Sequence, residues 1–254
     1  LKVRPPHLLT WLSDDPVDVL CLQETKLTDD TCPIAEINAA GYQVAFSGQS
    51  TYNGGAILSL KAISDVVKNK PRFEDAQQRV LAATIDGVRI VDVYVVNGQA
   101  VGSEKYDYKL RWLAALHDWL REEIARHPKL VVLGDFNIAP DDRDVHDPLL
   151  WNDDSILTST AERAALQRLF ALGLHDSYRL LHADGGVFSW WDYRQAGFRR
   201  HLGLRIDLVL ARDGLPGACI GDTVEPDTGA RERPSGHTPV PAPPRRARAE
   251  GGRA

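Results

Sequence analysis

The chain has 254 residues, of which 43% are apolar and 26% are charged, and its formal net charge is −5. This composition is typical of a globular protein with one large domain or two small ones. The acidic balance argues against a protein that coats nucleic acid by bulk charge. No apolar run approaches the ~18 residues of a membrane-spanning helix. The three cysteines fit no metal-binding spacing, so we expect a reducing, cytoplasmic environment.

The hydrophobic pattern predicts strands and helices that alternate irregularly along the chain. Asp86-Gly87 lies between two apolar runs and predicts a hairpin. Ser159 and Glu162 have the spacing of a capping box and predict the start of a helix. In chain order, we expect a helix at 6–11, strands at 18–25, 41–46 and 55–60, the hairpin strands at 80–85 and 88–94, a helix at 107–126, a strand at 130–133, a helix after 159, and strands at 187–193 and 205–210.

This order predicts an α/β fold with sheets inside and helices outside. We find no internal repeat and no linker, so residues 1–240 are expected to form one domain. Residues 241–254 are rich in Pro, Gly and Arg and have no periodicity, and we predict that this tail is disordered.

Polar side chains stand at the ends of several predicted strands. Asp135 and Asn137 follow the strand at 130–133, and residues two apart in a strand point to the same side. The spacing therefore predicts a carboxylate and an amide on one face. The other polar residues within or after these strands are Glu24, Tyr94, Asn97, Asp207 and His237.

Such residues can serve phosphate chemistry. Carboxylates and amides held by rigid strands could bind Mg²⁺ or Mn²⁺ through oxygen. A His with an Asp partner could accept a proton, or could stabilise a phosphorane as a cation. Spacing alone slightly favours a metal-assisted phosphoesterase.

Each of these residues also has a purely structural explanation. Asp135 and Asn137 could form an Asx turn. The other structural alternatives are an ion pair of Asp207 with Arg205 or Arg212, a solvated carboxylate at Glu24 and a surface position for His237.

Six short sequence motifs occur in this order along the chain: LQETK at 22–26, YVVNG at 94–98, GDFN at 134–137, FSWWDYR at 188–194, GLRID at 203–207 and PSGH at 234–237. In this order, and with SEKYDYK at 103–109, the chain resembles the exonuclease III family of class II abasic-site endonucleases, within the endonuclease/exonuclease/phosphatase superfamily. The resemblance runs from about residue 1 to Val240. GDFN and the PSGH motif with its terminal His are general to the superfamily, whereas the other motifs are more specific to the exonuclease III branch.

The resemblance implies a four-layer α/β sandwich, in which two mixed sheets pack face to face and helices lie outside. It also implies a role for each polar residue at the strand ends. Glu24 would be the main metal ligand, Asp135 would activate or position the attacking water, Asn137 would orient a water or phosphate oxygen, Asp207 would hold His237 in its tautomer, His237 would act on the phosphate or the water, and Tyr94 would place its phenol at the scissile phosphate.

The implied reaction is Mg²⁺- or Mn²⁺-dependent hydrolysis of DNA phosphodiesters at abasic sites and at 3′ ends of duplex DNA, leaving a 3′-hydroxyl. We expect a monomer, because no self-complementary apolar stripe stands out, and no membrane partner, because the sequence shows no membrane-binding segment. Aromatic and basic residues interleave after residue 188, which fits either a wedge and a phosphate grip at a lesion or a core Trp pair with a solvated basic loop. The DNA-binding candidates are Trp190, Arg194, Arg199, Arg200 and Lys105, with Lys109 as a further phosphate contact or a solvated charge.

The chain departs from the family pattern in three places. The family begins with a strand that carries an Asn, whereas this chain starts just after that point and contains no Met. The family has Asp before the terminal His, where this chain has Gly236, and the final strand is replaced by the Pro-rich run from Pro241. We therefore expect the first and last strands to be missing and activity to be impaired. The alternatives are an abasic-site binding protein that does not cut, and a superfamily phosphatase for lipid or inositol phosphates.

Overall fold

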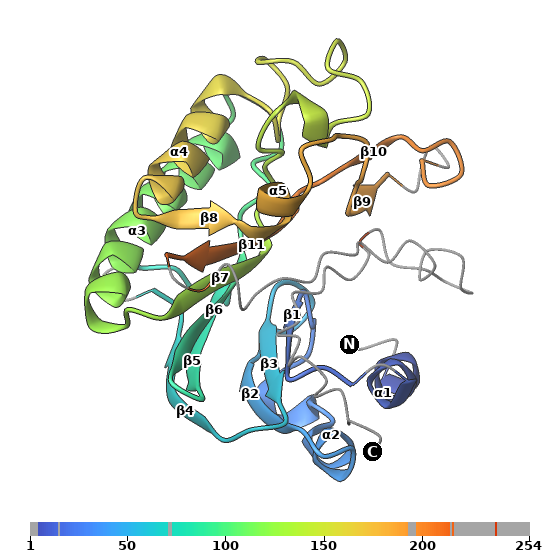
Figure 1. Ribbon diagram of the computed structural model, residues 1–254, viewed down its shortest axis with the longest axis vertical. Coiled ribbons are helices and arrows are strands. Elements are labelled where there is room, and N and C mark those ends of the chain that lie inside the picture. Colours follow the sequence, from blue (N-terminus) through green and yellow to red (C-terminus); the bar gives the residue numbers. More distant parts are fainter. Residues whose placement is uncertain are drawn as a thin grey trace, which may run out of the picture.

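The computed structural model describes residues 5–14, 16–70, 73–192, 197–213, 215 and 237, with side chains from residue 8 onward (Figure 1). In chain order, the helices and strands are α1 (Pro5–Asp14), β1 (Val19–Gln23), the 3-10 helix Asp29–Thr31, α2 (Ile34–Ala39), β2 (Gln43–Ser47), β3 (Gly55–Ser59), β4 (Ile63–Lys68), β5 (Val80–Ile85), β6 (Val88–Tyr94), α3 (Glu104–Arg126), β7 (Leu130–Asp135), the 3-10 helix Asp142–Asp144, α4 (Thr160–Phe170), β8 (Leu174–Asp176), α5 (Ser177–Leu181), β9 (Trp190–Trp191), β10 (Gly203–Leu204) and β11 (Asp207–Arg212).

Two sheets form the centre of the molecule. One has six strands in the order β4-β5-β6-β7-β11-β8, and the other has three in the order β1-β3-β2. A short pair, β9 with β10, lies apart from both sheets. The helices α3 and α4 cover the outer face of the six-stranded sheet, and α1 and α2 lie beside the three-stranded sheet (Figure 1). This is the predicted four-layer arrangement.

Alternation along each strand explains the layers, because neighbouring side chains point to opposite faces. In β7, Leu130 and Val132 pack against the helices α3 and α4. Val131 and Leu133 instead pack against residues of the three-stranded sheet, such as Ile57. The six-stranded sheet is therefore apolar on both faces, as expected for a sheet covered on both sides.

Local signals explain where the long helices begin. The hydroxyl of Ser103 accepts the Tyr106 amide at 3.2 Å and caps α3, which starts three residues earlier than predicted. The predicted capping box at Ser159 and Glu162 is present at the start of α4. Both helices bury one apolar stripe in the same core as the sheet.

The predicted hairpin strands match β5 and β6 at both ends. The strand predicted at 187–193 is reduced to β9, and the short elements β4, β8, α2 and α5 were not predicted. The expectation of two mixed sheets is wrong for the smaller one, whose described strand pairs are all antiparallel. Among the described strands, only β6 and β7 pair in parallel, because the α3 crossover between them brings the chain back in the same direction.

The expectations of missing terminal strands and of a disordered tail concern residues outside the described ranges. Among the described helices, none has the length and apolarity that crossing a membrane requires.

Candidate active site

Three of the predicted site residues lie in one row across the six-stranded sheet. Tyr94 on β6 is in register with Asp135 on β7, and Asp135 is in register with Asp207 on β11. Residues paired in this way project from the same face of a sheet. Asp135 shares that face with Val131 and Leu133, so the row looks toward the three-stranded sheet.

The structure at the end of β7 explains why Gly, Asp and Asn follow the apolar residues of this strand in the sequence at 130–137. Gly134 has φ +134°, and a Cβ there would lie 2.1 Å from the Val93 carbonyl oxygen on the neighbouring strand, so only glycine fits. The backbone N–H of Asn137 donates to Asp135 Oδ1 at 2.8 Å, and its side-chain Nδ2 donates to Asp135 Oδ2 at 3.1 Å. The Asx turn considered from the sequence is therefore present, and it orients both oxygens of the buried carboxylate.

Asn137 has a left-handed backbone with φ 49°, which is uncommon for a residue other than glycine. Its Nδ2 also donates to the Val95 carbonyl at 2.9 Å, and its Oδ1 accepts from Asn97 Nδ2 at 3.2 Å. These contacts hold the amide in one orientation beside Asp135. Such over-determined backbone geometry is typical of functional sites.

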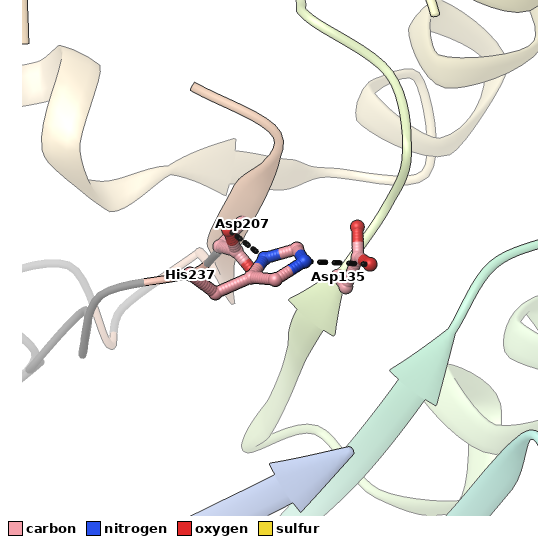
Figure 2. Close-up of side chains that lie close together, drawn as sticks. All are labelled: Asp135, Asp207 and His237. Atoms are coloured by element: carbon pink, nitrogen blue, oxygen red, sulfur yellow. Dashed lines mark hydrogen bonds and ion pairs between the residues drawn. The ribbon is translucent and has the colours of Figure 1, made fainter. Parts of the chain in front are cut away.

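His237 lies between the two aspartates of the row (Figure 2). Its Nδ1 is 3.0 Å from Asp207 Oδ2, and its Nε2 is 3.8 Å from Asp135 Oδ2. A backbone bridge between His237 and Trp190 places the imidazole here. The alternatives of a surface histidine and of an Asp207–arginine pair are thus wrong. Arg205 pairs instead with Asp144 and Asp176, Arg212 donates to the Leu172 carbonyl, and the described residues include no ion pair of either arginine with Asp207.

Asp135 and His237 lie side by side but have different pKa values. Burial raises the pKa of Asp135 to about 7, and His237 opposes this rise while Asp207 adds to it. Burial lowers the pKa of His237, but Asp207 and Asp135 together outweigh it and raise the value to about 10. At neutral pH the imidazole is therefore a cation, and Asp135 is the group poised to exchange a proton.

Glu24 directly follows β1, an edge strand of the three-stranded sheet, and this sheet faces the row. Its backbone has φ 49°, and its carboxylate accepts from Lys26 Nζ at 2.6 Å and from the Tyr94 phenol. Burial opposes ionisation, but the hydrogen bonds from Lys26 and Tyr94 outweigh it and hold the pKa of Glu24 below its ordinary value. Burial and the Glu24 charge raise the pKa of Tyr94, so its hydroxyl stays a donor at neutral pH.

The donor atoms fit a hard divalent cation. Asp135, Asp207 and His237 each offer a ligand atom, and these atoms lie within 4.8 Å of one another. His237 is a cation paired with Asp207, so carboxylate oxygens are the donors that Mg²⁺ or Mn²⁺ would use. Glu24, which accepts the Tyr94 phenol, supplies a further carboxylate on the side of the three-stranded sheet.

The predicted DNA-binding residues are exposed to different degrees. Trp191 is buried, whereas Trp190 is half-buried against Leu204 and Ile206 and lies beside His237. Arg199, Arg200 and Lys105 are exposed, and Arg194 lies outside the described residues. Lys109 is not a phosphate contact or a solvated charge, because its side chain is fully buried in an ion pair with Glu162.

One residue that positions Asp207, Ser189, was not identified from the sequence. The buried hydroxyl of Ser189 accepts the backbone N–H groups of Ile206 at 3.1 Å and of Asp207 at 3.0 Å. It therefore fixes the start of β11, where Asp207 enters the row. The only local signal was its place within FSWWDYR, because the partner strand is 17 residues away in the chain.

The sequence profile of the endonuclease/exonuclease/phosphatase family matches residues 4–235. The exodeoxyribonuclease III of Haemophilus influenzae is 31% identical over 252 residues, covering 94% of both chains. A solved structure of the 3′ phosphatase NExo from Neisseria, bound to a product DNA hairpin, is 47% identical with a TM-score of 0.92 and covers 94% of this chain and 93% of that one. An AP endonuclease from Archaeoglobus fulgidus is 33% identical with a TM-score of 0.86, covering 91% and 90%.

Proposed function

This chain belongs to the exonuclease III branch of the endonuclease/exonuclease/phosphatase family, and from that premise we propose that it hydrolyses phosphate esters of duplex DNA at 3′ ends and at abasic sites. The observation that carries the proposal is the row of Tyr94, Asp135 and Asp207, completed by His237. A protonated imidazole and a carboxylate of pKa about 7 stand side by side in this row. This is a suitable pairing for attack of water on a phosphate.

In the proposed reaction, Asp135 takes a proton from the attacking water, whose oxygen bonds to phosphorus while the bond to the leaving 3′ oxygen breaks. The leaving oxygen takes up a proton from solvent and becomes the 3′-hydroxyl. His237 donates hydrogen bonds to the phosphate as a cation and is held in place by Asp207. The phenol of Tyr94, with its raised pKa, donates to a phosphate oxygen. Asn137 holds the Asp135 carboxylate and orients the water.

Carboxylates of Glu24 and of the aspartate row would hold Mg²⁺ or Mn²⁺. The bound cation would supply charge neutralisation at the developing phosphate oxygens. Trp190, Arg194, Arg199, Arg200 and Lys105 would contact the DNA. We propose a monomer that works in the cytoplasm.

The relatives guide the choice of substrate. The NExo structure, a 3′ phosphatase, is 47% identical to this chain, whereas the AP endonuclease from Archaeoglobus is 33% identical. We therefore place removal of a blocking 3′ phosphate first and incision at abasic sites second. Both reactions would leave a 3′-hydroxyl that a polymerase can extend.

The test uses three labelled duplexes that carry a 3′ phosphate at a gap, an internal abasic site or a recessed 3′-hydroxyl end. Each is incubated with Mg²⁺ and with a chelator. We expect metal-dependent release of inorganic phosphate from the first duplex at the highest rate. Binding to all three without hydrolysis would favour the non-cutting alternative. Inositol phosphates are assayed in parallel, and turnover of these alone would favour the phosphatase alternative.

Gly236 allows a second prediction about the metal. It directly precedes His237, and an aspartate there would add one oxygen donor beside the site. We expect Gly236→Asp to lower the Mg²⁺ concentration needed for half-maximal rate by about 10-fold, the lower end of the effect of one supporting group. Equal Mg²⁺ titrations of the two proteins would refute this role.

A further inference from the structure

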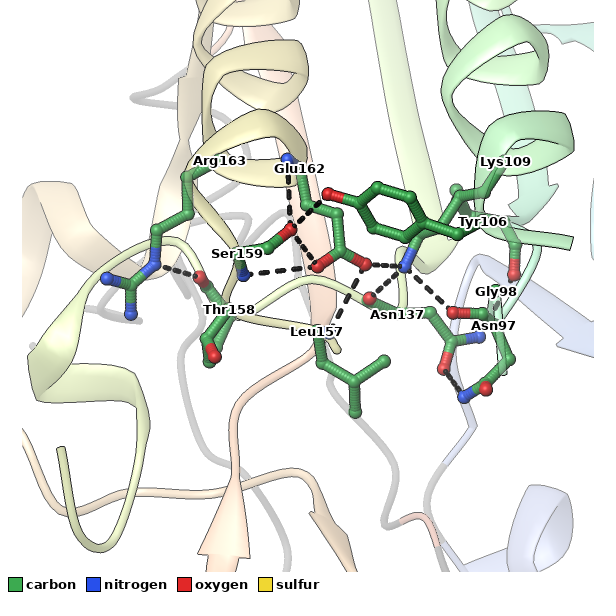
Figure 3. Close-up of polar contacts among 12 residues, drawn as sticks. Asn97, Gly98, Tyr106, Lys109, Asn137, Leu157, Thr158, Ser159, Glu162 and Arg163 are labelled. Carbon is green, nitrogen blue, oxygen red and sulfur yellow. Dashed lines mark hydrogen bonds and ion pairs between the residues drawn. The ribbon is translucent and has the colours of Figure 1, made fainter. Parts of the chain in front are cut away.

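Lys109 is a fully buried lysine whose ammonium lies among carbonyl oxygens behind the active site (Figure 3). Lys109 belongs to helix α3, and its side chain points inward. Its Nζ donates to the Asn137 carbonyl at 2.8 Å and to the Asn97 carbonyl at 3.1 Å. Its third partner is the carboxylate of Glu162 on α4. All three ammonium hydrogens therefore have acceptors.

The two carbonyls belong to the two loops that carry the amides of the site. Asn97 follows β6, and Asn137 follows β7. The side chains of these residues also meet, since Asn97 Nδ2 donates to Asn137 Oδ1. A Cβ on Gly98 would lie 3.0 Å from Lys109 Cδ, and Gly98 has φ +94°, so the first loop passes closely over the lysine stem.

Glu162 is held as firmly as the lysine it faces. Its carboxylate accepts the Leu157 amide at 3.2 Å, the Ser159 amide at 3.1 Å and the Ser159 hydroxyl at 2.6 Å. The same hydroxyl lies 2.7 Å from the Tyr106 phenol of α3 (Figure 3). The network thus joins both outer helices to both active-site loops.

We propose that Lys109 is a positioning residue for the hydrolytic reaction, and that its ammonium sets the orientation of Asn137 against Asp135. The proposal rests on the function proposed above for those two residues. Without Lys109, the buried Asn137 carbonyl and the part-buried Asn97 carbonyl lose this donor, and the left-handed backbone at Asn137 loses one of the contacts that hold it. The Asn137 N–H and Nδ2 would then no longer fix the two oxygens of Asp135.

The competing explanation is that the Lys109–Glu162 pair only stabilises the fold. The chain offers a matched control in Arg89 and Glu123, a second buried pair in which Arg89 Nε donates to Glu123 Oε2 at 2.8 Å. It also joins β6 to α3. Arg89 is in register with Leu130, at the opposite end of the strands that end in Tyr94 and Asp135.

The experiment compares Lys109→Met/Glu162→Gln with Arg89→Met/Glu123→Gln. Each double variant removes both charges of a buried pair, which avoids an uncompensated charge. Steady-state kinetics on the best DNA substrate are measured well below the lowest melting temperature. We expect kcat of the Lys109 variant to fall about 10- to 100-fold, with KM changed by less than about 3-fold. The Arg89 variant should keep kcat within about 3-fold of the parent.

Equal losses of kcat in the two double variants at matched stability would overturn the proposal. A second comparison uses the single variants Lys109→Met and Glu162→Gln, measured at a temperature at which both are folded. Both break the same ion pair, but only the first removes the donor to the two carbonyls. A larger kcat loss in Lys109→Met supports positioning, and equal losses contradict it.

Amide hydrogen exchange tests the same idea without activity. We expect faster exchange in residues 134–138 and 95–99 of the Lys109 variant, with unchanged exchange in β5. Unchanged exchange in both loops would refute positioning even if the parent hydrolysed no DNA. A parent without hydrolysis would instead count against the proposed function.

Discussion

Asp135 and His237 differ in pKa because they respond differently to the same surroundings. Burial raises the pKa of the carboxyl group to about 7. Burial disfavours the imidazolium, but the aspartates on both sides raise the pKa of His237 to about 10. Between these values the carboxylate is free to accept a proton while the imidazolium stays charged, so in the proposed reaction Asp135 serves as the base and His237 as the cation.

This division predicts a bell-shaped dependence of kcat/KM on pH. The rate should rise as Asp135 loses its proton, with a limb near pH 7, and should fall as His237 loses its proton near pH 10. Added positive charge from bound Mg²⁺ lowers the pKa of a nearby carboxyl, so the acid limb should move downward as Mg²⁺ increases. Rate measurements from pH 5 to pH 10.5 at several Mg²⁺ concentrations would show both limbs.

Asp135→Asn keeps the shape of the side chain and removes the proposed base. We expect kcat to fall by about 10²- to 10⁴-fold, the usual contribution of a general base. The variant should bind the DNA duplex about as well as the parent in a mobility-shift assay. A variant that kept more than a tenth of the parent kcat would show that another group accepts the proton.

At the scale of elements, the row of Tyr94, Asp135 and Asp207 depends on how β11 starts. Ser189 precedes β9, and its hydroxyl accepts the backbone N–H of Ile206, just before β11, and that of Asp207, the first residue of β11. Its own N–H donates to the Leu204 carbonyl at 2.9 Å. The short pair β9 and β10 therefore reaches the site through one serine, and through the bridge between Trp190 and His237.

Ser189→Ala should leave two buried N–H groups without acceptors. We expect a loss of about 1–3 kcal/mol in the free energy of unfolding, together with a lower kcat because Asp207 shifts. Ser177→Ala is the control, since the Ser177 hydroxyl donates to the Val209 carbonyl at 3.0 Å on the same strand. The control should lose stability without losing kcat. Urea unfolding and steady-state kinetics test both, and parallel losses of kcat would contradict the role of Ser189.

At the scale of the whole molecule, a part-buried polar contact links the two sheets. Gln23 at the end of β1 donates from Nε2 to Asp92 Oδ1 on β6 at 2.5 Å. Burial raises the pKa of Asp92 well above its ordinary value, and the hydrogen bond from Gln23 only partly opposes this. The folded protein therefore keeps this carboxyl protonated at pH values where the unfolded chain ionises it.

The sign of the resulting pH effect follows from linkage. Because the folded state binds the extra proton, the Asp92 contribution to stability is complete below the unfolded pKa and is lost as pH rises toward the folded pKa. Asp92→Asn mimics the protonated carboxyl and does not titrate. We expect it to melt at a higher temperature than the parent at pH 8, with a difference that shrinks toward pH 4. Thermal unfolding across this range checks the expectation, and a constant difference would exclude a titrating Asp92.

Local patterns in the sequence were sufficient for the hairpin of β5 and β6, the capping box at Ser159 and the polar groups at the strand ends. Each depends on residues close together in the chain, where turn chemistry and periodicity act directly. The six short motifs and their order along the chain also identified the family. The same patterns did not predict β4 and β8, whose short strands are stabilised by pairing with distant partners.

Only the tertiary structure decided which partner each polar residue took. Asp207 had two arginines nearby in the sequence, yet sheet register placed it beside Asp135 and His237. Lys109 had the pattern of a solvated helix charge, yet the packing of α3 on α4 buried it against Glu162. The reason is physical, since local sequence determines which face a side chain occupies, whereas register and helix packing between distant segments determine what that side chain meets.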